Sequence, residues 1–408
     1  MKSEIHLFIM WEYARKNQEK LLAEISSKFN ILKICNITWS PYLVSRNFTR
    51  FYGQKLLNNS DKEIHCGKGE FKLIIVEDNS PIYDNRITSQ GRVSVNINMF
   101  DTKVKLRNLT GGGHKIHGTN DPNETRHDLL LLLGSTVEDF IKGNKEDADT
   151  EVSLIQDLFG TKGWNSFDEL FNGLNYLSDY VVLRNSENIN LEYIKKNGGD
   201  IDILSKDKLE LIFFLGGELN LNGHYEVSIN NQIILFDIYQ SNQNLFYQKL
   251  EDDIFINKIK VNNIFVPGRD YGFYILIYHA VINNKVLGNK HLQRIKKNMK
   301  GFPEFFELEP SQENLIEILD RFMSLNNYYY IKPNDNRVQI YNYNHDLYVE
   351  NKRRLSTVFF FLSKLISISY KNRLIKISLI KNKRTLLYFK TYLPKIINLE
   401  FRIGRSIV

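Results

Sequence analysis

The stretch that decides the fold of the central chain is Tyr180-Val-Val-Leu-Arg184 and, after a polar connection, Gly198-Gly-Asp200-Ile-Asp202-Ile-Leu204. Its two apolar runs are short and are bounded by turn residues, which is typical of buried strands. Residues two apart on a strand point to the same face, so Asp200 and Asp202 share a face. Two carboxylates on one side of a buried strand repel each other unless a cation lies between them. Either a hard cation such as Mg2+ binds there, or both residues end the strand and face solvent.

A third carboxylate follows within a later apolar run, Gln232-Ile-Ile-Leu-Phe-Asp237-Ile-Tyr239. If this second strand pairs beside the first, Asp237 becomes a third metal ligand. We therefore predict that Asp200, Asp202 and Asp237 are catalytic residues that hold Mg2+ or Mn2+.

This pattern, a Gly-Gly-Asp-x-Asp strand with a third Asp on a later strand, resembles the nucleotidyltransferase superfamily over roughly residues 149–343. The resemblance implies that the three acids hold one or two metal ions, which activate the attacking oxygen and the leaving phosphate. Arg184, at the end of the preceding strand, is a candidate ligand-binding residue.

Length and composition bound the remaining possibilities. A chain of 408 residues is long for a single core, so two or three domains are expected. Two cysteines, Cys35 and Cys66, are too few for a disulfide framework and fit a reducing compartment. The charged N-terminus lacks the apolar segment of a signal peptide, and the sequence has no run of 18 apolar residues. We therefore expect a cytoplasmic protein.

The charge of the chain is divided unevenly. After residue 351 the sequence has fourteen Lys and Arg against one acid, Glu400, a net charge of +13. Because the whole chain carries +7, residues 1–351 carry −6. This asymmetry predicts an anionic partner for the segment 351–408, either a membrane or a nucleic acid.

Residues 1–141 are predicted to form an α/β unit that alternates strands and helices, close to a ferredoxin-like pattern. The predicted strands are residues 5–11, 31–39, 71–76 and 116–121, and the predicted helices are residues 17–29, 42–57, 99–109 (or an extended segment) and 124–133. Residues 78–91 are rich in turn-forming residues.

The segment Gly111-Gly-Gly-His-Lys-Ile-His117-Gly-Thr-Asn-Asp121 has three competing interpretations. The backbone amides of Gly111, Gly112 and Gly113 could bind a phosphate, with His114, Lys115 and His117 adding charge or a nucleophile. Alternatively, His114, His117 and His127 could bind zinc. The third interpretation is a glycine turn that feeds a strand with hydrogen-bonded histidines. Thr125 and Asp128 are predicted to be helix-surface residues.

The apolar-His117-Gly-Thr-Asn-Asp context, followed by a helix from Glu124, resembles nucleoside diphosphate kinases over about 130 residues. The resemblance implies that His117 takes up a phosphoryl group and that Arg107 binds phosphate. The first strand continues into Trp11-Glu-Tyr-Ala14 where that family has Lys-Pro-Asp-Gly. The fold can persist with altered chemistry.

Residues 142–150 are charged and form the predicted domain boundary, so residues 150–350 are assigned to a nucleotidyltransferase-like domain with a mixed sheet. Helices are predicted at residues 166–177, 270–282 and 311–323, and the later ones would cap this domain. His279 is predicted to be a packed, hydrogen-bonded helix residue. Residues 291–300 are basic and could contact a phosphate or form a solvated face.

The basic C-terminal tail, residues 351–408, interleaves Lys and Arg with aliphatic and aromatic residues, and its apolar stretch is too short to span a bilayer. This composition fits an interfacial segment on anionic lipid. It also suits an RNA backbone, or a small packed element whose charges face water.

These features predict an α+β, metal-dependent transferase that binds a nucleotide or a nucleotide-activated sugar and lies at the inner face of the membrane. The whole chain resembles uncharacterised proteins of bacterial surface-polysaccharide assembly, which implies transfer of a nucleotidyl or phospho-sugar group to a lipid-linked or soluble sugar. An RNA nucleotidyltransferase and a catalytically degenerate membrane scaffold are the alternatives.

Overall fold

The computed structural model describes residues 2–56, 60–88, 91–144, 151–184, 199–283, 287–331 and 348–349. The protein belongs to the α+β class, as the sequence predicted, and residues 1–350 form one compact unit. The predicted basic tail, residues 351–408, and Gly198 of the predicted glycine turn lie outside the described residues. Among the described helices, none combines the length and the apolar character needed to cross a membrane.

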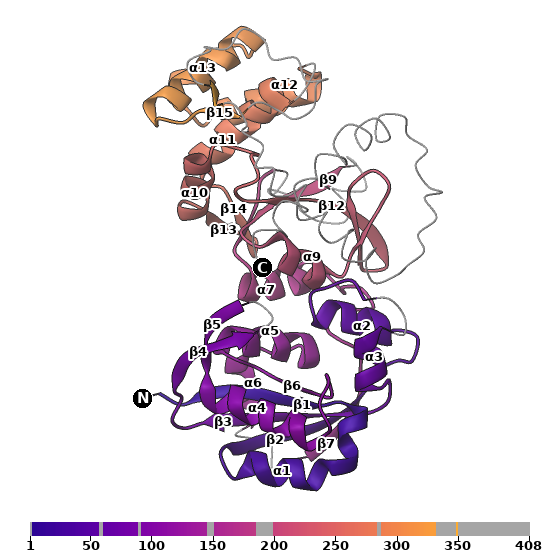
Figure 1. Cartoon of the computed structure of the whole chain (residues 1–408). Coiled ribbons are helices and arrows are strands. Elements are labelled where there is room, and N and C mark those ends of the chain that lie inside the picture. Colours follow the sequence, from indigo (N-terminus) through magenta and orange to yellow (C-terminus); the bar gives the residue numbers. More distant parts are fainter. Residues whose placement is uncertain are drawn as a thin grey trace, which may run out of the picture. The chain divides into compact units, whose positions relative to one another are not determined.

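The N-terminal sheet has the strand order β6-β1-β3-β2-β7 (Figure 1). Its strands are β1 (Glu4–Met10), β2 (Asn30–Thr38), β3 (Phe71–Asp78), β6 (Ile116–Gly118) and β7 (Glu151–Ile155). The pairs β1–β3, β1–β6 and β2–β3 are antiparallel, and β7 lies parallel to β2. Strand β7 was predicted to belong to the central domain, but its backbone pairs with β2 of the N-terminal sheet.

Helices cover both faces of this sheet. They are η1 (Glu12–Asn17), α1 (Gln18–Ser26), α2 (Val44–Phe51), α3 (Asp61–Cys66), α4 (Ile97–Leu109), α5 (Pro122–Leu133) and α6 (Val137–Asn144). Alternate residues of a strand point to opposite faces. Phe8 and Met10 of β1 therefore pack with α1 and α4, whereas Leu7 and Ile9 pack with α2 and α5.

A hairpin of β4 (Tyr83–Thr88) and β5 (Gly91–Asn96) occupies the segment predicted to be turn-rich. The observed helices α1 and α2 are shorter than the predicted ranges, and residues 97–109 are helical rather than extended. The hairpin was missed because its residues are mostly polar and exposed, so they give little hydrophobic alternation.

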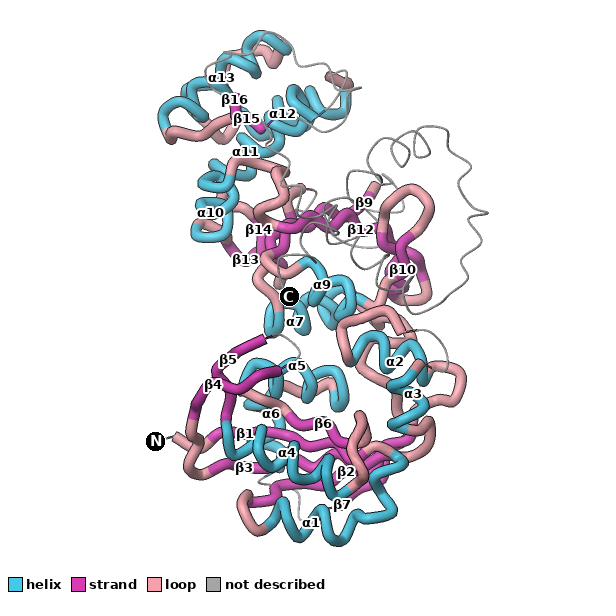
Figure 2. The backbone as a smooth tube through the Cα atoms, in the orientation of Figure 1, coloured by secondary structure: helices cyan, strands magenta, loops and turns pink. Residues whose placement is uncertain are grey.

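The central sheet has the strand order β10-β11-β12-β9-β8, and Figure 2 labels β9, β10 and β12 of this sheet. Its strands are β8 (Tyr180–Val182), β9 (Asp200–Ser205), β10 (Glu218–Leu219), β11 (Tyr225–Ile229) and β12 (Gln232–Gln240). Strands β9 and β12 are parallel, and the other neighbours are antiparallel. The sheet is therefore mixed, and it brings together the two acid-bearing strands identified in the sequence.

The two faces of the central sheet have different neighbours. Ile201 and Ile203 of β9 pack with α7 (Phe167–Leu177) and α9 (Lys208–Leu215). Leu204, on the opposite face, packs with helices from the last third of unit 1–350. These are α10 (Gln248–Ile256), α11 (Arg269–Tyr278), α12 (Asn289–Met299) and α13 (Gln312–Leu325), accompanied by β13 (Ile259–Val261), β14 (Ile264–Val266), η3 (His279–Asn283), η4 (Pro303–Phe305), β15 (Tyr330–Ile331) and β16 (Tyr348–Val349).

One apolar core links the N-terminal and central sheets. It contains Leu7 and Ile9 of β1 together with Ile203 of β9 and Phe236 of β12. Polar contacts reinforce it, because the buried guanidinium of Arg50, on α2, donates hydrogen bonds to the main-chain carbonyls of Phe159 and Phe213. The parts of the chain before and after residues 142–150 therefore pack against each other in one shared core.

Candidate functional site: a carboxylate row beside a basic pocket

The predicted acids lie on adjacent strands of the central sheet. In the parallel pair β9–β12, Asp202 is opposite Asp237, and Asp200 is two residues earlier on β9. Residues in register on neighbouring strands point to the same side of a sheet, as do residues two apart on one strand. Asp200, Asp202 and Asp237 therefore share one face, which is the face whose apolar residues pack against α10–α13.

Asp202 is the most buried of the three, with 1% of its surface exposed, and it forms an ion pair with Arg184. Burial raises its pKa, Arg184 opposes that rise, and the charges of Asp200 and Asp237 add to it. The pKa of Asp237 is also raised, by burial first and by Asp200 second. Burial, rather than the repulsion between carboxylates, is thus the main cause of both shifts.

The group of possible metal ligands in the central sheet differs from the predicted triad. It consists of Asp200, Asp237 and His224, whose ligand atoms all lie within 4.8 Å of one another. Asp202 is engaged by Arg184 instead. The Nδ1 atom of His224 is buried and, among the described residues, makes no hydrogen bond of normal geometry, although it lies 2.7 Å from Oδ1 of Asp237. A cation between these three side chains would satisfy all of them, so the residues fit a metal ion.

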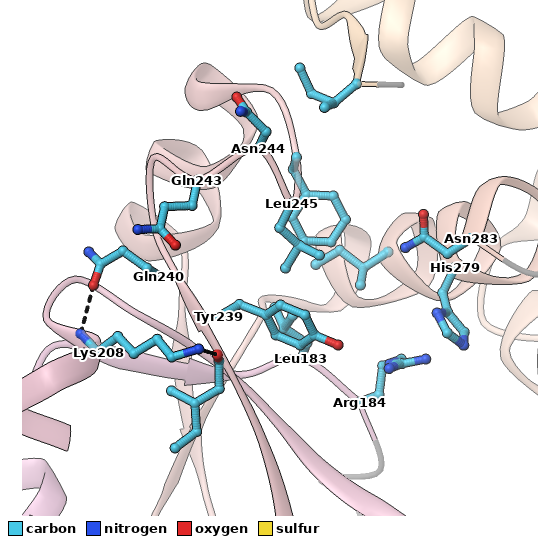
Figure 3. Close-up of a pocket in the computed structure, with 14 residues that line it drawn as sticks. Leu183, Arg184, Lys208, Tyr239, Gln240, Gln243, Asn244, Leu245, His279 and Asn283 are labelled. Atoms are coloured by element: carbon cyan, nitrogen blue, oxygen red, sulfur yellow. Dashed lines mark hydrogen bonds between the residues drawn. The ribbon is translucent and has the colours of Figure 1, made fainter. Parts of the chain in front are cut away.

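A cavity of about 440 Å3 adjoins this row of charges (Figure 3). Tyr239 connects the two, because its side chain lines the cavity and its hydroxyl lies 3.3 Å from Oδ2 of Asp237. Arg184 lines the cavity as well. The polar part of the lining consists of basic and amide side chains: Arg184, Lys208, Gln240, Gln243, Asn244, His279 and Asn283. Such a lining suits an anionic, polar ligand.

One wall of the cavity is the π-helical turn η3, which supplies His279 and Asn283. π-Helical turns are rare overall, and those that occur are often found at functional sites. In Figure 3, His279 and Arg184 lie on the same side of the cavity. Burial lowers the pKa of His279 to about 3, and the positive charges of Arg184, His291 and Arg294 contribute. His279 is partly buried, and it also lines a pocket.

A second cavity, of about 200 Å3, shares Leu183 and Arg184 with the first. Arg269 and Arg294 also line it, and the latter comes from the basic helix α12. Basic side chains from three separate segments therefore gather around Arg184.

In the N-terminal part, His117 lies on β6 and its ring contacts the aromatic residues Phe51 and Tyr52. Its Nε2 atom lies 2.7 Å from Oδ2 of Asp128 and 3.9 Å from Oε1 of Glu124. The prediction that Asp128 faces solvent is wrong, because only 3% of its surface is exposed. The carboxylate fixes the orientation of the imidazole and leaves Nδ1 as the second ring nitrogen.

The prediction that Thr125 lies on the surface of the same helix, α5, is also wrong. Thr125 is 1% exposed, and its hydroxyl donates a hydrogen bond to Oγ1 of Thr119. Thr125 and Asp128 fall on the apolar stripe of α5, at helical spacing with Leu129 and Leu132. These polar side chains can be buried on this face because residues of β1 and β6 provide hydrogen-bond partners for them.

The three-histidine zinc interpretation is not supported by the geometry. His127 contacts Asp128 through Nδ1, at 3.0 Å, and the ring of His114 lies near His65. The described ligand group around His117 contains Glu124 and Asp128 but neither of the other two histidines.

The glycine turn adopts a left-handed backbone conformation that favours glycine. Gly111, Gly112 and Gly113 all have positive φ, at 77°, 81° and 79°. The predicted phosphate-binding cations are partly engaged, since Nε of Arg107 donates to Ile116 O and Nζ of Lys115 donates to Thr110 O.

Further basic groups surround this turn. Burial lowers the pKa of His114, and the nearby charges of Lys62 and Arg107 lower it further. Burial also lowers the pKa of Lys62, to about 8. An anion here would relieve the repulsion among these groups.

No protein-family model matches this sequence, and the search among curated proteins found no match. The residues that sequence reasoning missed are His224, beside the central acids, and Glu124 and Asp128, beside His117. Asp128 could have been found from the helical spacing of α5.

Proposed function

We propose that the protein is a metal-dependent transferase that moves a nucleotidyl or phospho-sugar group to an acceptor in surface-polysaccharide synthesis. The observation that carries the proposal is the placement of Asp200, Asp202 and Asp237 on one face of two parallel strands, directly beside a basic cavity. Carboxylates that gather next to cationic side chains suit a ligand that combines phosphate groups with a metal ion.

The arrangement of strands supports the finer assignment of the fold. The order β6-β1-β3-β2 with antiparallel neighbours fits a ferredoxin-like N-terminal part, extended by β7. The mixed central sheet with helices α10–α13 on one face fits a nucleotidyltransferase-like part with a helical cap.

In this proposal, Arg184, Lys208 and His279 bind the phosphate groups of the donor. The amides of Gln240 and Asn283 orient its polar groups, and Tyr239 offers an aromatic surface beside them. Asp200 and Asp237 would hold Mg2+ or Mn2+, with Asp202 as a further ligand when Arg184 releases it. The metal ion, when bound, supplies charge neutralisation for the attacking and leaving oxygens. The helices that cover the same face limit access of water to the reacting groups.

The N-terminal part would bind a phosphorylated or nucleotide ligand near His117 and the turn Gly111–Gly113. The pairing of His117 with Asp128 and the basic groups Lys62 and Arg107 support this role. A ligand phosphate near Nδ1 of His117 would be held by charge and by backbone N–H groups.

An RNA nucleotidyltransferase remains the alternative enzyme, and a degenerate scaffold the alternative without chemistry. The two enzyme alternatives can be separated by measuring whether the protein binds anionic membranes or RNA more tightly. If the protein is only a scaffold, it does not need the carboxylates, and substituting them should leave its function unchanged.

A thermal-shift screen of nucleotides and nucleotide sugars, with Mg2+ or Mn2+, tests the proposal. A ligand at about 100 times its dissociation constant should stabilise the protein by about 2.7 kcal/mol. Asp237→Asn should abolish the metal-dependent part of the shift. Glu218→Gln, which removes a carboxylate from exposed strand β10 of the same sheet, is the matched control and should retain it. A screen in which no nucleotide or sugar nucleotide stabilises the protein in either metal contradicts the proposal.

A further inference from the structure

His224 directly precedes β11 and belongs to a hydrogen-bonded turn. The turn before it is closed by two hydrogen bonds, one from Asn220 N to His224 O at 2.9 Å and one from His224 N to Oδ1 of Asn220 at 3.1 Å. Gly223 adopts a φ of 94°, which favours glycine. The side chain of His224 therefore starts from a fixed backbone.

The register of the neighbouring hairpin aims this side chain at the carboxylates. Strands β11 and β12 are joined by Asn230 and Asn231, both with positive φ, and Tyr225 pairs with Phe236. The next position along each strand places His224 opposite Asp237. Because Asp237 is itself opposite Asp202, the three residues form a row across three neighbouring strands.

The distances from His224 to Asp237 and Asp200 are short enough for the three side chains to share one cation. Nδ1 of His224 lies 2.7 Å from Oδ1 of Asp237 and 3.7 Å from Oδ2 of Asp200. The nitrogen is buried, and within the described part of the chain it makes no hydrogen bond of normal geometry. It therefore lies between two carboxylates, at ion-pair distance from both.

Nitrogen donors change which cation such a site prefers. Mg2+ and Mn2+ both bind carboxylates well, whereas an imidazole ligand favours first-row transition ions, such as Fe2+, Ni2+ and Zn2+, over Mg2+. Arg184 already neutralises Asp202, which leaves Asp200, Asp237 and His224 as the close ligand set. We propose that His224 is a metal ligand, and that with Asp200 and Asp237 it makes this site select a first-row transition ion such as Mn2+ over Mg2+.

This inference rests on the proposed function only in using the same carboxylates, and metal binding can be measured without a substrate. Mn2+ binding to the full chain is followed by electron paramagnetic resonance, with Mg2+ as competitor. The wild-type protein should bind Mn2+ about tenfold or more tightly than Mg2+, and pulsed spectra should show a nitrogen nucleus coupled to the bound Mn2+.

Three variants separate the possible outcomes. His224→Gln should weaken Mn2+ binding about tenfold or more, remove the nitrogen coupling, and change Mg2+ binding less than about threefold. His65→Gln, which alters an exposed histidine elsewhere, is the matched control and should behave as wild type. Asp237→Asn should weaken the binding of both ions.

Mn2+ bound without nitrogen coupling in the wild-type protein overturns the role of His224, even if His224→Gln fails to fold. If Asp237→Asn still weakens metal binding in that case, the carboxylate site and the proposed function survive. If neither Asp237→Asn nor His224→Gln changes binding of either ion, His224 only pairs with the carboxylate, and the metal site of the proposed function fails with it.

Discussion

At the scale of single residues, the pair Arg184–Asp202 stands out because both charges are largely buried, with 16% and 1% of their side chains exposed. Removing one partner of such a pair leaves the other charge uncompensated. Arg184→Met should therefore lower the free energy of unfolding by about 3 kcal/mol in urea denaturation. The double variant Arg184→Met with Asp202→Asn should recover most of that loss. Additive losses in the double variant would show that the two side chains do not depend on each other.

His279 gives the protein a predictable response to acid. Its pKa in the folded state, about 3, lies below the ordinary value of 6.5, so the unfolded chain takes up a proton first. Stability from this residue is present above about pH 6.5 and falls by about 1.4 kcal/mol per pH unit as the pH drops toward 3. His279→Asn should unfold with a shallower dependence on pH over this range. Parallel stability curves for the two proteins would contradict the burial of a neutral imidazole.

At the scale of elements, two helices end on a glycine with the same backbone conformation but different surroundings. Gly134, after α5, and Gly216, after α9, both have a φ of 67°. A Cβ atom would lie 3.2 Å from Cδ2 of Phe159 at the first position and 2.9 Å from Nε of Arg50 at the second. Arg50 is buried and held by several carbonyl groups, so it has little freedom to move.

Each glycine-to-alanine change should cost about 1–2 kcal/mol for the left-handed backbone alone. Gly216→Ala should cost about 1 kcal/mol more than Gly134→Ala, because it also disturbs the hydrogen bonds of Arg50. Urea denaturation of the two variants side by side measures the difference. Equal losses would mean that the guanidinium adapts without cost.

Also at the scale of elements, local sequence patterns predict part of the candidate site. The central strands were found from their apolar runs, and Asp200 and Asp202 share a face because strand periodicity is local. His224 could also have been found, since Asn230-Asn231 is a two-residue turn signal and counting outward from it pairs position 224 with Asp237.

Long-range pairing was harder to predict. The register of β9 against β12 depends on a connection that includes α9 and on packing from both sides, so no local pattern predicts it. The addition of β7 to the N-terminal sheet was missed for the same reason, because its partner β2 is over a hundred residues away. The helical period of α5, by contrast, is a local pattern that could have predicted Asp128 on the buried stripe, although Asp128 was predicted at the surface.

At the scale of the whole molecule, the uneven charge of the chain makes a prediction about membranes. Residues 1–350 form a compact unit by themselves, so removing residues 351–408 should leave a folded protein. If the basic segment binds anionic lipid, the truncated protein should lose sedimentation with anionic vesicles that the full chain shows. Neutral vesicles and an RNA competitor are the controls. Equal sedimentation of both proteins would rule out this role, and displacement by RNA would favour the nucleic-acid alternative.

The apolar core that contains residues of both sheets has a further consequence for how this chain is inherited and engineered. Cutting or recombining the gene near residues 142–150 would separate β7 from β2 and expose the shared core in both products. Neither half would then fold independently, and each fragment would be a substrate for chaperones and proteases rather than a folded protein. Gene fusion or domain shuffling would therefore preserve the carboxylate row only when residues 1–350 move together.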